Sequence, residues 1–152
     1  MIKRSMTLAG LLLMAVALVV SCTSQIKPAV TLETIGVRNE MAFVTLVSPS
    51  ADEVSATDLA NRLRQDWEWQ LYRGYEIEVL LFDNKEAPER WLEVWDASVT
   101  EYKEAMAQIY PHWIATYSRN AVTGLNQVKI LSRDANADVV RTITFPIRNG
   151  PD

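Results

Sequence analysis

The chain has 152 residues, of which 49% are hydrophobic and 22% charged, with a formal net charge of -4, one cysteine and one histidine. A length of this order suits one domain with one core. The acidic balance argues against nucleic acid as a partner, and a lone cysteine excludes an intrachain disulfide.

The N-terminal residues 1–21 have the three parts of an export signal. Lys3 and Arg4 form a positive start, and an apolar run of about 13 residues extends from Leu8 to Val20. A helix that crosses the hydrocarbon core needs about 20 apolar residues. We therefore expect a cleaved signal peptide, not a permanent transmembrane helix.

The residues Val19, Val20, Ser21 and Cys22 resemble the lipobox of bacterial lipoproteins: an aliphatic residue, a tolerant position, a small residue and cysteine. The resemblance is confined to this N-terminal part. It implies that the Cys22 thiol receives a diacylglyceryl group, that the signal is removed, and that acyl chains such as palmitate hold the protein on a membrane. The alternative is a secretory signal with an incidental cysteine, which would leave a free thiol in an oxidising compartment.

The same resemblance predicts where the protein resides and how it is divided. A lipoprotein would lie on the exported face of the cytoplasmic membrane or the periplasmic face of the outer membrane, and Thr23 is compatible with outer-membrane delivery. Loss of the two basic signal residues changes the net charge from -4 to -6. Residues 22–29 are expected to be the lipidated cysteine with a short tether, and residues 30–152 a single domain.

Two strands and a helix are predicted at the start of the domain. Residues 30–37 alternate loosely between apolar and polar side chains, and residues 41–47 form a clearer strand. A helix is expected to begin near Ser55, because Asp58 three positions later approximates a capping box. The apolar stripe of this helix is Leu59, Leu63 and Trp67, at four-residue spacing.

A strand and a long helix are predicted next. Residues 75–82 read as a strand, and Pro88 suits the first turn of the helix that follows. Asn84 or Asp83 is expected near the cap of this helix. Its apolar side chains recur every three or four positions: Trp91, Trp95, Val99, Tyr102, Met106 and Ile109.

The remainder of the chain predicts three consecutive strands, at 112–118, 127–131 and 139–145. We expect an α+β fold in which two helices pack on one face of a mainly antiparallel sheet of about five to six strands. The crossover from residues 41–47 through the first helix to residues 75–82 should be right-handed if these two strands are parallel. The predicted core consists of Leu59, Leu63, Val79, Leu81, Val99, Met106, Val128 and Ile130.

Asp134, Asn136 and Asp138 match the opening of a calcium-binding loop. Such a loop continues with glycine and ends on a bidentate glutamate, whereas this chain has Val139 and Phe145 at those positions. A hairpin turn is therefore the better interpretation. We expect no metal and no cofactor, since glycine-rich phosphate loops are also lacking in the sequence.

His112 is the single histidine, and its ordinary interpretation is a half-exposed strand residue. The sequence has no G-x-S-x-G or S-x-x-K motif, so no catalytic residue is assigned. An envelope hydrolase that uses carboxylates near His112 is the alternative function. Convergence of His112 with two acids in a pocket would favour it.

Aromatic residues are the unusual feature of this sequence, because every tryptophan and tyrosine lies between Trp67 and Tyr117. Aromatic residues at helical spacing are more often core than binding site. Trp67 and Trp69 cannot both face the core, because positions two apart on a helix point about 200° from each other. Trp69 and Tyr72 are therefore the candidate binding patch of a non-catalytic module, whose partner would be an unknown envelope protein or glycan.

Overall fold

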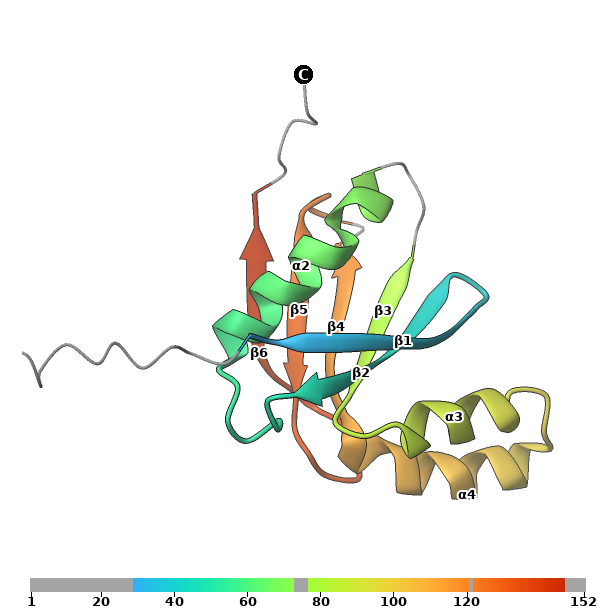
Figure 1. Ribbon diagram of the computed structural model, residues 1–152. Helices are drawn as coiled ribbons and strands as arrows, with labels where there is room; N and C mark the ends of the chain where they lie inside the picture. Colours follow the sequence, from blue (N-terminus) through green and yellow to red (C-terminus); the bar gives the residue numbers. More distant parts are fainter. Residues whose placement is uncertain (1–28, 73–76, 121, 147–152) are drawn as a thin grey trace, which may run out of the picture.

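The computed structural model describes residues 29–72, 77–120 and 122–146, with the side chains of 69–72 left out. Six strands, three α-helices and a short 3-10 helix make up this part (Figure 1). In chain order they are β1 (Thr31–Arg38), β2 (Met41–Ser48), α2 (Ala56–Tyr72), β3 (Glu78–Phe82), α3 (Glu86–Glu93), α4 (Val99–Ile109), η2 (Tyr110–His112), β4 (Trp113–Arg119), β5 (Asn126–Leu131) and β6 (Val139–Phe145).

The strands form a single mixed sheet in sequence order, β1-β2-β3-β4-β5-β6. Four of the five neighbouring pairs are antiparallel, and β2 and β3 are parallel, with Met41 opposite Glu78. Parallel neighbours need a crossover connection, which α2 supplies. The α+β class predicted from the sequence is confirmed.

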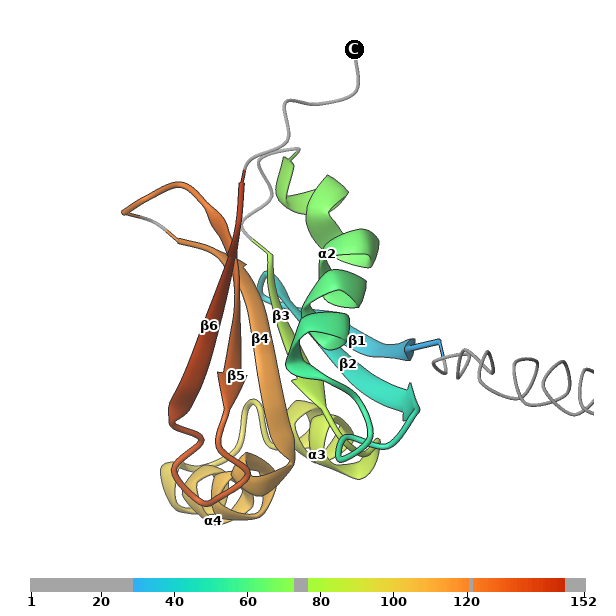
Figure 2. The same cartoon turned by 90° about the vertical axis from the view of Figure 1, so that its left-hand side faces the viewer.

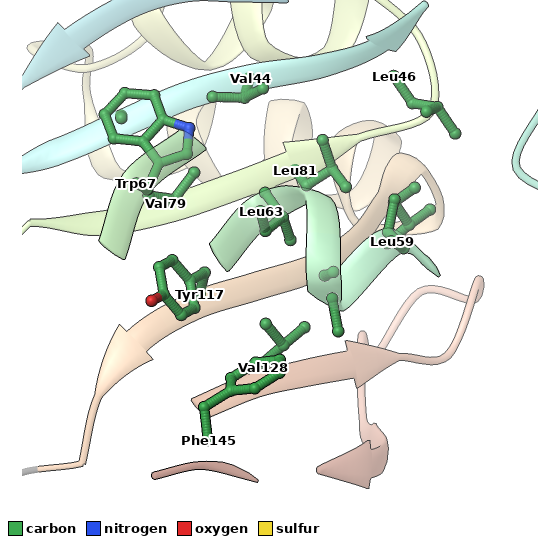
Figure 3. Packing of buried hydrophobic residues seen from close by; sticks show 14 residues of the cluster. Val44, Leu46, Leu59, Leu63, Trp67, Val79, Leu81, Tyr117, Val128 and Phe145 are labelled. Atoms are coloured by element: carbon green, nitrogen blue, oxygen red, sulfur yellow. The ribbon is translucent and has the colours of Figure 1, made fainter. Parts of the chain in front are cut away.

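Helix α2 covers one face of the sheet and builds the larger core. It begins as predicted, because the backbone N–H of Asp58 donates to Oγ of Ser55 at 3.2 Å. Its stripe of Leu59, Leu63 and Trp67 is buried against Val79, Leu81, Tyr117 and Val128 of the central strands (Figure 3). Ile130, also predicted as core, is half-buried and packs against the same cluster.

The opposite face of the sheet is covered by α3 and α4, so the prediction of helices on one face is wrong. Successive side chains of β2 alternate: Ala42 and Val44 belong to the α2 core, whereas Phe43 packs with Trp91 of α3 and Met106 of α4. Figure 2 shows α2 alongside the strands and α3 and α4 together at one end of the sheet. A strand with apolar side chains on both sides must be buried on both faces of the sheet. Residues 41–47 have this pattern, which indicates helices on both faces.

The long helix predicted from Pro88 to Ile109 is two helices. α3 ends at Glu93, and the side chain of Ser98 caps α4 by accepting from the N–H of Glu101 at 3.3 Å. Val99 therefore opens a new helix, and with 72% of its surface exposed it is not the core residue predicted. The break lets the two helices fold back on each other, so that both reach the second core.

Candidate functional site

The residues singled out from the sequence lie mostly outside what the structure describes. Cys22 belongs to residues 1–28, beyond the described range. The backbone of Trp69 and Tyr72 forms the last turns of α2, while their side chains lie outside the described part. The patch therefore stays a prediction.

His112 lies where η2 meets β4, and a carboxylate holds it there. Its Nδ1 is 2.9 Å from Oδ1 of Asp83, which directly follows β3. The backbone N–H of Asp83 in turn donates to the carbonyl of His112 at 3.0 Å. Two contacts therefore fix the pair, one through side chains and one through the backbone.

Arg133 extends this pair into a group of four residues, here named the Asp83 network: Asp52, Asp83, His112 and Arg133. Nη2 of Arg133 lies 2.6 Å from Oδ2 of Asp83, and its Nη1 contacts the carboxylate of Asp52. Asp52 follows β2, Asp83 follows β3, His112 ends η2 just before β4, and Arg133 follows β5. The fold thus brings His112 together with two acids, one directly and one through Arg133.

The tautomer of His112 follows from its partner. The Asp83 side chain is only 9% exposed, and its Oδ2 contacts the Arg133 guanidinium. An ionised carboxylate only accepts hydrogen bonds, so the assigned proton of neutral His112 is on Nδ1. The Nε2 lone pair is then left for another molecule, and the His112 side chain is 44% exposed.

The Asp83 network lies at a reversal in the chain path. After β2 the chain enters α2 on one face of the sheet, and after β3 it enters α3 on the other. In open sheets with parallel strands, ligands bind beyond the carboxyl ends of two such strands, because the connections diverge there. Asp52 follows β2 and Asp83 follows β3, so both acids occupy the position that this rule selects.

Sequence reasoning missed most of this network for a physical reason. From the sequence, Asp83 is only a possible residue near a helix cap, although its position directly after a buried strand also indicates a site residue. The prediction of Asn84 or Asp83 near the cap is confirmed for Asn84, which precedes the N-cap residue Lys85 and whose Oδ1 accepts from the N–H of Ala87 at 2.9 Å. Arg133 lies 50 positions from Asp83, and no local pattern links residues so far apart.

The segment from Asp134 to Asp138 is the hairpin turn that the sequence predicted. Oδ1 of Asp134 accepts from Oγ of Ser132 at 3.0 Å and from the N–H of Asn136 at 2.9 Å, and Ala137 has a positive φ of 50°. The N–H of Asn136, followed by the Ser132 hydroxyl, lowers the pKa of the Asp134 carboxyl. Through these hydrogen bonds the Asp134 carboxylate stabilises the turn that connects β5 and β6.

Most of the aromatic residues with described side chains are structural. Trp91 packs edge-on against Phe43 and Trp113, with ring centroids 5.5 Å apart in both pairs. Trp67 is buried in the α2 core at 8% exposure. The expectation that aromatics at helical spacing are mainly core is confirmed for these residues.

No protein-family model, curated protein or solved structure matches this chain. Among the helices of the described ranges, none is long and apolar enough to cross a membrane. Those ranges also hold no group of three or more histidine, cysteine, aspartate or glutamate residues placed to bind a metal ion.

Proposed function

We propose that this chain is a lipid-anchored cell-envelope protein and that its α+β domain works as an interaction module. The observation that carries the proposal is the sequence ending in Cys22, where a small residue and cysteine close an apolar run of signal-peptide length. Cell-envelope proteins and glycans are the candidate partners. The membrane would be contacted through the lipid on Cys22.

The number of residues between Cys22 and the first strand limits the distance between the domain and the membrane. β1 begins at Thr31, so eight residues separate it from Cys22. Eight residues span at most about 28 Å when fully extended. A domain on such a tether meets partners that lie in, or close to, the bilayer surface.

The burial of Trp67 supports an interaction surface on α2. Its indole occupies the core, and the helix continues without a break to Tyr72. The helical period then predicts that Trp69 points away from the sheet. Rigid aromatic side chains outside a core are frequent anchors of interfaces, since they bury much area at little entropic cost.

The lipid anchor is tested with Cys22→Ser. Cells that express the wild-type chain are fed an alkyne fatty acid, and we expect label on the wild type and none on the variant. The variant should also keep its signal or be cut elsewhere. Equal labelling of both proteins would contradict the anchor.

The interaction surface is tested separately, by photo-crosslinking in cells. A photoreactive amino acid replaces Tyr72 in the full lipidated chain, and the matched control carries it in place of Glu104, an exposed residue of α4. We expect discrete adducts from position 72 and none of them from position 104. The same adducts from both positions would refute a specific patch.

The alternative function, an envelope hydrolase, is supported by a different observation, the contact between His112 and Asp83. An aspartate that fixes the ring of a histidine is a recurring part of acid–base sites. This reading does not depend on Trp69 or Tyr72.

A further inference from the structure

We propose that Asp83 and His112 form a proton-transfer pair, in which Nε2 of His112 activates water for the hydrolysis of an uncharged carboxylic ester. The proposal rests on the hydrolase alternative and is independent of the lipid anchor. It assigns His112 as the general base and Asp83 as the residue that positions it.

Orientation is the first argument. The Asp83 carboxylate lies 2.9 Å from Nδ1 of His112, which leaves Nε2 as the acceptor of a side chain that is 44% exposed. A histidine acts as general base only with its lone pair directed to the reacting proton. Asp83 also stabilises the imidazolium that forms, while the Arg133 guanidinium holds the second oxygen of its carboxylate.

Location is the second argument. Asp52 and Asp83 stand beyond the carboxyl ends of the parallel pair β2 and β3, where the chain diverges to opposite faces of the sheet. This is the place where sheets of parallel strands bind small molecules. His112 reaches the same place from the neighbouring strand β4, which is antiparallel to β3.

Charge selects the class of substrate. With His112 neutral, the two carboxylates and the guanidinium of the Asp83 network sum to -1. A phosphate or carboxylate substrate would meet net repulsion at this group, whereas an uncharged ester would not. We therefore assign an acyl ester, not a phosphate ester, to this site.

The reaction conserves atoms and charge with the residues present. Water oxygen bonds to the acyl carbon while Nε2 of His112 takes a water proton, and the carbonyl electron pair moves onto oxygen. The tetrahedral intermediate then expels the alkoxide, which takes the proton from Nε2 as it leaves. A carboxylic acid and an alcohol result, and Asp83 stays ionised throughout.

The orientation is tested by nitrogen NMR of the full-length protein in detergent micelles. The chain has one histidine, so every imidazole signal belongs to His112. We expect the Nδ1–H tautomer in the wild type and a mixture of tautomers in Asp83→Asn. Asp96→Asn is the matched control, since it removes a carboxylate from the Arg38 ion pair outside the Asp83 network. A wild type with its proton on Nε2 would overturn the proposal.

The chemistry is tested with 4-nitrophenyl acetate as the neutral ester and 4-nitrophenyl phosphate as the anionic one. His112→Asn keeps a donor for Asp83 but has no base, and we expect it to lower kcat/KM for the acetate by about 100-fold or more. Asp83→Asn should lower it by about 10- to 100-fold and Asp96→Asn should leave it unchanged. Thermal melts show whether each variant is folded.

Three results would overturn the proposal. The first is a wild-type rate no higher than that of equimolar imidazole. The second is an acetate rate that folded His112→Asn retains. The third is faster turnover of the phosphate than of the acetate, which would contradict the assigned substrate class.

Discussion

Nη2 of Arg133 lies 2.6 Å from Oδ2 of Asp83, and this contact ties the end of β5 to the end of β3 across the intervening strand. Asp83 is the more buried partner, with 9% of its side chain exposed against 42% for Arg133. Removing the guanidinium therefore leaves a mostly buried carboxylate with one charged donor fewer. That loss costs more than breaking a pair in which both groups are hydrated.

Arg133→Met is predicted to lower the free energy of unfolding by about 1 kcal/mol, a value already reduced for the exposure of the arginine. Urea denaturation measures it. The matched control is Arg38→Met, which breaks the Arg38–Asp96 pair, where 38% and 79% of the two side chains are exposed. We expect the control to stay within about 0.5 kcal/mol of the wild type. Equal losses in the two variants would show that the burial of Asp83 does not strengthen its ion pair with Arg133.

Tyr117 is fully buried at the centre of the α2 core, and its hydroxyl has no well-formed hydrogen bond with any described residue, only a weaker polar contact with the side chain of Asn126. Tyr117→Phe is therefore predicted to leave stability unchanged or to raise it by up to about 1 kcal/mol, because no well-formed hydrogen bond is lost and a buried polar atom is removed. Chemical denaturation near neutral pH measures the difference. A loss of 2 kcal/mol or more would require a partner for the hydroxyl.

The same substitution carries a pH signature. Burial, with a smaller contribution from the Glu68 charge, raises the pKa of Tyr117 from 10.0 to about 12, although Arg64 and Asn126 act in the opposite direction. The folded state thus resists ionisation that the unfolded chain undergoes near pH 10. Stability that this group contributes is intact below pH 10 and is lost as the pH rises from 10 towards 12. Tyr117→Phe should show a smaller decline over that range than the wild type does.

Trp67 and Trp69 should respond oppositely to truncation. Trp67→Ala removes an indole that is 8% exposed, and we expect a loss of about 3–5 kcal/mol. Trp69→Ala should change stability by less than about 0.5 kcal/mol, as surface substitutions usually do. Denaturant melts of both variants decide the matter. A large loss in Trp69→Ala would assign this side chain to the core and withdraw the patch.

The domain is predicted to fold without metal. Thermal melts of the full-length protein with and without a chelator should superimpose, because the Oδ1 atom of Asp134 is engaged by Ser132 and Asn136 within the turn. A chelator-induced fall of several degrees in Tm would restore the calcium reading of this segment.

Local patterns predicted the elements of this fold well and their relative placement less well. The capping Ser55, the stripe through Leu63 and the strand 139–145 are readable because each depends on residues a few positions apart. The break before Val99 was missed because the apolar spacing continues through it. Only the hydroxyl of Ser98, which caps the start of α4, marks the new helix. Periodicity does not register such a cap.

The candidate site was harder to predict from the sequence than the fold, because its residues lie beyond the ends of different strands and meet only in the folded chain. His112 could be noted as the one histidine, but its contact with Asp83 joins residues 29 positions apart. Only the strand order β3-β4-β5 brings them and Arg133 to the same end of the sheet. Residues of this kind become visible once topology is known.

The one parallel pair in the described sheet also has a consequence for the order of folding. β4, β5 and β6 join through short turns, so their pairing closes small loops and can form early. β2 and β3 pair only after the chain has closed around α2, which is slower because a longer loop loses more entropy. The chain would therefore assemble its C-terminal meander first. The ends of β2 and β3, and with them the contact between Arg133 and Asp52, would be completed last.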